Sequence, residues 1–145
     1  MQATFAATSN YNAVTATGNF TIAKAANPIS VTATQSWSAT YSTSNQNKTF
    51  TAASSAQGSV TYAIQSQKNG SGTNVTYFSI PTSGTASLRM AAKTPVTGSS
   101  YTVVIRATAA GNDNYNAGYK DITMTVTVGK ANGTASVTMA DWTYG

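Results

Sequence analysis

Two stretches near the end of the chain alternate apolar and polar residues with a period of two. They span residues 101–108 and 122–128, and strict alternation is typical of a β-strand with one buried face. Between them, residues 111–118 read GNDNYNAG, and Gly and Asn tolerate the positive φ angles that turns require. The pattern therefore predicts a β-hairpin.

Five weaker runs of apolar and β-branched residues precede this hairpin. They cover residues 29–34, 48–53, 59–65, 73–80 and 85–90, and Gly-, Pro- and Asn-containing turn signals separate them. Seven strands at a spacing of roughly 8 to 12 residues predict an all-β antiparallel sandwich, with its two sheets about 10 Å apart. We expect the following side chains to point inward: Val31, Trp37, Phe50, Val60, Tyr62, Ile64, Phe78, Ile80, Leu88, Met90, Tyr101, Val103, Ile105, Ile122, Met124, Val126 and Val128.

The chain also repeats part of its own sequence. Asn10–Ala13 recurs as Asn114–Ala117 at an offset of 104 residues, and Lys24–Ala25 recurs as Lys130–Ala131 at an offset of 106. Ser30–Thr32 recurs at the second offset as well. A period near 105 residues fits a sandwich domain of about 100 residues and is too long for a solenoid unit.

This repeat predicts the domain organisation. Residues 1–26 are expected to be the last two strands of a preceding repeat, residues 27–130 one complete repeat, and residues 131–145 the start of the following one. Unpaired strand edges near residues 3–24 invite pairing with another chain. We therefore expect this segment either to be mobile or to form a strand-swapped or strand-added oligomer.

Composition strengthens the all-β interpretation. Only 8% of the residues are charged, against about 25% in an average soluble domain, and Glu is absent. Thr and Tyr favour a pleated, half-buried surface, whereas the Ala-Glu-Lys-Leu runs that build surface helices are missing. Helical folds are therefore disfavoured.

Charge and hydropathy argue against two classes of partner. The net charge of +5 comes from Lys and Arg residues scattered singly along the chain, whereas a nucleic-acid footprint needs them concentrated on one face. No run approaches the roughly 18 apolar residues of a membrane span, and residues 1–10 lack the features of a signal peptide. We expect no nucleic-acid partner and no direct membrane insertion, and any targeting or anchoring segment should lie outside this sequence.

The side chains that carry most enzyme chemistry are scarce. The absence of His and Cys removes Ser-His-Asp and Cys-His nucleophiles and the usual zinc sites. Asp113, Asp121 and Asp141 form no credible carboxylate pair for glycoside hydrolysis, and no phosphate-binding loop pattern occurs. We therefore expect neither an enzyme nor a bound cofactor.

Residues 101–131, YTVVIRATAAGNDNYNAGYKDITMTVTVGKA, combine two closing strands with a Lys-Ala junction into a new first strand. This arrangement resembles the tandem bacterial immunoglobulin-like and cadherin-like repeats of large surface proteins from Gram-positive, gut-type bacteria. The closing ASVTMADWTYG, residues 135–145, resembles the opening of a related short β repeat in such proteins. The resemblance implies a seven-stranded immunoglobulin-like sandwich with partial repeats at both ends, exposed at a cell surface or cell wall, and it transfers no binding residues.

Two further chemistries occur in domains of this kind. A calcium site could involve Asn112–Asn114, but calcium needs six to eight oxygen ligands and usually several carboxylates, so a turn is favoured. An intramolecular Lys-Asn isopeptide cross-link needs a desolvated Lys beside an acid, and only Lys48 or Lys120 with Asp121 are candidates. Neither site is expected.

Aromatic residues outside the clearest core pattern are candidates for stacking on sugars. We select Trp37, Tyr41, Tyr115 and Tyr119 as candidate ligand residues, and Trp142 is a further aromatic of this kind. The competing interpretation is that tyrosines near sandwich corners bury their rings and bond to the backbone.

The sequence favours a structural spacer or stalk repeat of a secreted or cell-surface bacterial protein, presenting other domains. Neighbouring repeats of the same chain are its expected partners. The alternative is an adhesin or carbohydrate-binding module that recognises a host glycan or protein through loops such as residues 67–73 and 111–118.

Overall fold

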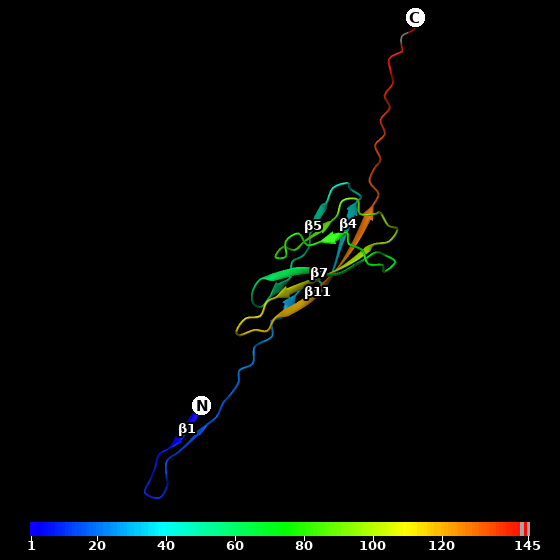
Figure 1. Ribbon diagram of the computed structural model, residues 1–145. Helices are drawn as coiled ribbons and strands as arrows, with labels where there is room; N and C mark the ends of the chain where they lie inside the picture. The colour runs from blue at the N-terminus through cyan, green and yellow to red at the C-terminus, as the bar shows by residue number, and fades with distance from the viewer. Residues whose placement is uncertain (143, 145) are drawn as a thin grey trace.

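The predicted hairpin forms the centre of the largest sheet in the computed structural model, which describes residues 1–142 and 144 (Figure 1). Strands β10 (Tyr101–Ala109) and β11 (Gly118–Gly129) pair antiparallel, with Ile105 opposite Ile122. Strand β7 (Val60–Lys68) pairs antiparallel with β10, and β4 (Thr34–Thr40) pairs parallel with β11. The strand order is β4-β11-β10-β7.

A second layer covers the apolar face of this sheet. It contains β5 (Gln46–Thr49), β9 (Ser87–Met90) and β8 (Phe78–Ser79) in the order β5-β9-β8, and the short pair β3 (Ile29–Ser30) and β6 (Ser54–Ser55). One hydrophobic core joins the two layers, so the fold is an all-β sandwich, as predicted. We refer to residues 27–130 as the sandwich.

The core contains the side chains that the sequence pattern predicts to point inward. Every predicted inward residue is either buried or packed half-buried against the buried cluster. Val103, Ile105, Ile122 and Val126 have no exposed surface, because each sits on the inner face of a central strand. All buried members of the cluster lie between Ile29 and Val128, so the core of the described residues does not extend into either end segment.

The strand layout differs from the prediction in two respects. Residues 29–34 form only the two-residue strand β3, and the sequence did not predict two further strands, β4 directly after β3 and β6 at residues 54–55. The sandwich, which the structure describes completely, thus has nine strands instead of seven. The sheet is also not wholly antiparallel, because β4 and β11 both run away from the end at which the chain enters and so pair parallel.

The two end segments project from opposite ends of the sandwich (Figure 1). Strands β1 (Gln2–Phe5) and β2 (Val14–Thr17) form a separate antiparallel hairpin whose residues are all exposed. Residues 131–142 are exposed and extended, without regular secondary structure. Among the described residues, no helix has the length and hydropathy needed to cross a membrane.

Candidate functional site

The four candidate ligand aromatics do not form a common surface. Trp37 is only 8% exposed and belongs to the core, so its ring is not accessible for stacking on a sugar. Tyr41 is half-buried against the core beside Gly129, at the end of β11. Tyr115 and Tyr119 lie at the opposite end of that strand, before and after Gly118. A single sugar therefore cannot contact all of the accessible rings.

Tyr119 belongs instead to a small charged cluster on the outer face of the large sheet. The Arg106 guanidinium carbon lies 4.2 Å from the centre of the Tyr119 ring. Its Nε and Nη2 donate hydrogen bonds of 2.8 and 3.0 Å to the two carboxylate oxygens of Asp121. This bidentate pair joins β10 to β11 and uses one acceptor site on each carboxylate oxygen.

The ion pair has a defined pH response. The hydrogen bond from Arg106 holds the pKa of the Asp121 carboxyl below its ordinary value. Stabilisation from this pair is therefore present above the ordinary carboxyl pKa and is lost as the pH falls through the lowered one. We expect Arg106→Gln to raise the Asp121 pKa toward its ordinary value, which an NMR titration of the side-chain carboxyl carbon measures. An unchanged pKa would show that Arg106 does not stabilise the carboxylate.

The residues considered for the cross-link and for calcium do not have the surroundings that these chemistries require. Lys48 and Lys120 are exposed, so their amines are not desolvated as an isopeptide bond requires. The side-chain oxygen of Asn112 accepts hydrogen bonds of 2.9 Å from the backbone N–H groups of Asn114 and Tyr115, which makes this segment an Asx turn. In the part of the chain that the structure describes, no three acidic, His or Cys side chains cluster to hold a metal ion.

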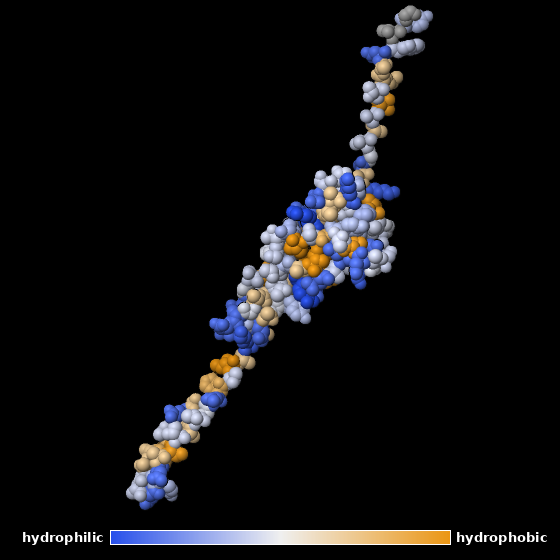
Figure 2. All heavy atoms as spheres, viewed as in Figure 1, coloured by the Kyte–Doolittle hydropathy of each residue, from blue (hydrophilic) through white to orange (hydrophobic). Residues whose placement is uncertain are grey.

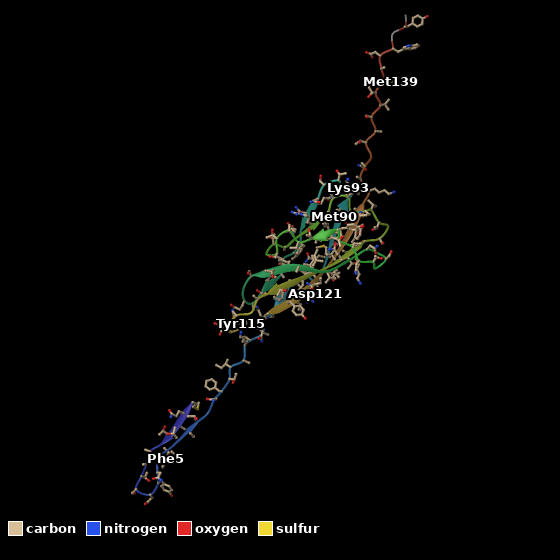
Figure 3. The ribbon with its side chains drawn as sticks, in the orientation of Figure 1. Phe5, Met90, Lys93, Tyr115, Asp121 and Met139 are labelled. Atoms are coloured by element: carbon tan, nitrogen blue, oxygen red, sulfur yellow. The ribbon has the colours of Figure 1, made fainter. Side chains whose placement is uncertain are left out.

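The Asx turn at Asn112 also contacts the linker, residues 18–26, at the point where the linker meets the sandwich. The N–H of Ala25 donates to the Asn114 carbonyl and the N–H of Asn116 donates to the Ala25 carbonyl, both over 2.8 Å. The view with side chains places Tyr115 at this end of the sandwich, close to the linker (Figure 3). Backbone pairing therefore continues from the sandwich into the segment that precedes it.

A second contact fixes the first residue of the sandwich. Asn27 is 4% exposed, and its side-chain amide donates to the carbonyl of Gln57 and accepts from its N–H, both over 3.0 Å. Gly118 approaches from the other side, so closely that a Cβ there would lie 2.1 Å from the Asn27 carbonyl oxygen. We call these contacts together the linker junction. It consists of the contacts of Ala25 with the turn and those of Asn27 with Gln57 and Gly118.

The side of the sandwich between β4 and β5 is hollowed, and the Gln35 amide in its lining is already paired. Gln35 lies at this hollow, where its amide accepts from the Thr51 N–H over 2.7 Å and donates to the Thr51 carbonyl over 3.1 Å. Gln35 thus links the two layers. Lys48 is the only charged residue of the lining, so the hollow offers a surface for polar contacts and no acid-base pair.

The linker junction was not predicted from the sequence, although Asn-Pro at residues 27–28 marks a turn. Its partner Gln57 lies 30 residues away, and local patterns do not show such a contact. In comparisons with known proteins, no protein-family model and no curated sequence matches this chain.

Proposed function

We propose that residues 27–130 are an immunoglobulin-like spacer repeat of an extracellular or cell-surface protein, which holds neighbouring modules apart and resists tension between its two ends. The observation that carries this proposal is the parallel pairing of β4 with β11, over seven residue pairs from Thr123↔Thr34 to Gly129↔Thr40. No catalytic role is part of the proposal.

The direction of these strands determines how they respond to force. The chain enters the sandwich before β4 and leaves it after β11, at the opposite end (Figure 1). Tension between the ends pulls β4 and β11 along their axes in opposite directions, so it loads the whole ladder in shear. The ladder is bounded by two hydrogen bonds of 2.8 Å, from the Thr123 N–H to the Ala33 carbonyl and from the Tyr41 N–H to the Gly129 carbonyl.

A corner contact supports the immunoglobulin-like interpretation. Tyr101 begins β10, its ring is 1% exposed, and its hydroxyl donates a 2.8 Å hydrogen bond to the carbonyl of Pro95 in the preceding loop. The ring packs edge-on against Tyr77 and Phe78. Immunoglobulin-like sandwiches use a tyrosine in this way, near the start of the corresponding strand. Burial raises the Tyr101 pKa, which keeps the hydroxyl protonated as a donor.

The linker junction supports a spacer role as well. Hydrogen bonds at Ala25 and Asn27 limit rotation between the sandwich and the residues before it. Carbohydrate binding has weaker support, because Trp37 is buried and the tyrosines lie at separate ends of the large sheet.

The proposal is tested by pulling a single molecule from two different pairs of points. The chain contains no Cys, so handles can be attached at introduced cysteines without interference. Lys24→Cys with Lys130→Cys applies force along the chain and loads β4 and β11 in shear. Lys24→Cys with Asp113→Cys applies force at one end of both strands and opens the ladder one bond at a time. We expect the first pair to need a several-fold higher unfolding force.

Equal forces from the two pairs of points would contradict a mechanical role for the parallel ladder. Both variants carry exposed substitutions, and matching thermal unfolding would show that their folded states are equally stable. A glycan-array signal from the same protein, together with equal forces, would favour the binding module instead.

A further inference from the structure

The isolated hairpin β1–β2 reproduces the tip of the central hairpin of the sandwich. Its pairs Ala3↔Ala16 and Phe5↔Val14 correspond to Ala107↔Lys120 and Ala109↔Gly118 at the same offset of 104 residues on both strands. The turns correspond too. The N–H of Thr8 donates to the Tyr11 carbonyl over 2.8 Å, as that of Asn112 donates to the Tyr115 carbonyl over 3.0 Å.

The two hairpins differ in what surrounds them. In the sandwich, β11 continues past the hairpin tip along β4, and its residues Val126 and Val128 are buried. The residues at the corresponding positions after β2 are Phe20 and Ile22, at the offset of 106. They are 74% and 84% exposed, and residues 18–23 form no strand. Gly18 still pairs with Met1, but the residues after it have the apolar pattern of a paired strand and, among the described residues, no partner strand.

The opposite end of the chain carries a copy of the missing partner. Ser136–Thr138 repeats Ser30–Thr32, the residues just before β4. Trp142 then corresponds to Trp37 of β4 at an offset of 105 residues, which implies one deletion between them. Val137, Met139 and Trp142 are 88%, 85% and 89% exposed.

These two segments are too far apart to meet within one molecule. Phe5 and Met139 lie in the two thin segments at opposite extremes of the molecule, with the sandwich between them (Figure 3). Hydrophobic side chains are visible along both segments in the space-filling view (Figure 2). A second molecule placed head to tail would bring its C-terminal segment to the N-terminal hairpin of the first.

We propose that residues 136–142 of one copy add as a parallel strand to residues 14–20 of a second copy. The pairing Val126↔Trp37 in the sandwich sets the register, and it places Trp142 opposite Phe20. Backbone hydrogen bonds to an exposed strand edge supply the binding, and the apolar side chains supply the register. The two surfaces differ, so the interface is heterologous and each added molecule leaves a free segment at both ends of an open chain.

Two variants separate the two halves of this interface. Phe20→Asp disrupts the N-terminal segment that accepts the added strand, and Trp142→Asp disrupts the C-terminal segment that is added. Both residues are exposed in the monomer. In sedimentation velocity, the unsubstituted chain should show a series of oligomers that grows with concentration, whereas each variant alone should remain a monomer. A mixture of the two variants should form a dimer and nothing larger, because it contains one intact donor and one intact acceptor.

The outcomes that overturn the proposal are equally specific. A strictly monomeric unsubstituted chain at the highest soluble concentration would refute it. Either variant alone forming the full series would show that another surface is responsible. Unchanged thermal unfolding of both variants confirms that the sandwich itself is intact.

The register has its own test, which keeps both aromatic residues in place. The pair Thr125↔Ser36 in the sandwich corresponds to Asn19 opposite Asp141. Asn19→Cys with Asp141→Cys should therefore give a ladder of disulfide-linked oligomers on mild oxidation. The control, Asn19→Cys with Ser136→Cys, moves the second thiol five residues away, about 16 Å along a strand, and should give no ladder. Equal ladders from both pairs would refute the proposed register.

Discussion

Replacing Val103 by Asp is expected to leave the sandwich unfolded at neutral pH. Val103 has no exposed surface and lies opposite Met124 in the centre of the large sheet. A carboxylate there has no cation within the core to pair with, since the cluster around it is apolar. Burying an unpaired charge costs about 5 kcal/mol or more, which is comparable to the whole stability of a typical domain. Loss of amide chemical-shift dispersion and of cooperative thermal unfolding would report the effect.

The next residue provides a matched control. Val104 points to the outer face of the same strand, beside Arg106, whose guanidinium tolerates an added carboxylate. Val104→Asp should therefore remain folded, with a loss of about 1 kcal/mol for the poorer strand propensity. If both variants fold, or both unfold, the inner and outer faces of β10 have been assigned incorrectly.

This contrast explains why the sequence predicted the central strands so well. In β10 and β11, one face contacts the core and the other contacts solvent, so apolar and polar residues alternate, with Val104 as the exception. Strand β4 also has one buried face, but it turns only Trp37 and Ala39 into the core and is otherwise Thr, Ser and Gln. Such a short apolar signal cannot be distinguished from a loop. Its strand conformation comes from a partner about 90 residues later in the chain, as the pairs of β11 with β4 show.

The candidate site was harder to predict than the fold. Trp37 qualified both as a core residue and as a ligand residue, because sequence alone does not tell which face an aromatic ring contacts. The sequence selects Tyr119 only as an aromatic outside the clearest core pattern, and its partner Arg106 follows from the register of β10 and β11. Asn27 carries no periodic signal at all, since its role depends on the backbone of Gln57.

In the proposed spacer role, the linker junction and the parallel ladder would carry the same force in series. Force reaching the sandwich from the N-terminal side passes through Ala25 and Asn27 before it reaches β4. The hydrogen bonds at these residues hold the start of the path against the tip of the β10–β11 hairpin. A loosened junction would therefore allow rotation at the linker while leaving the ladder between β4 and β11 intact. A substitution can therefore change the rotation at the linker junction without changing the force needed to break the β4–β11 ladder.

Gly118→Ala should loosen that junction at a cost of about 3 kcal/mol in the free energy of unfolding. The new methyl group would lie 2.1 Å from the Asn27 carbonyl oxygen, and Asn27 cannot retreat freely because Gln57 holds its side chain. Urea denaturation measures the loss. Gly98→Ala is the matched control, because nothing lies within 4 Å of a Cβ at that position, and it should change the stability by less than about 1 kcal/mol.

A double-mutant cycle with Asn27→Ala connects this cost to the junction. Asn27→Ala alone should cost about 2 kcal/mol, because it removes two hydrogen bonds to the Gln57 backbone, each worth about 1 kcal/mol. If Gly118→Ala acts by displacing Asn27, those hydrogen bonds are already lost in the single variant, and the double variant should cost clearly less than the sum of the two. Strict additivity would mean that the methyl group is accommodated elsewhere, by movement of β11 away from the linker, and that Asn27 stays in place.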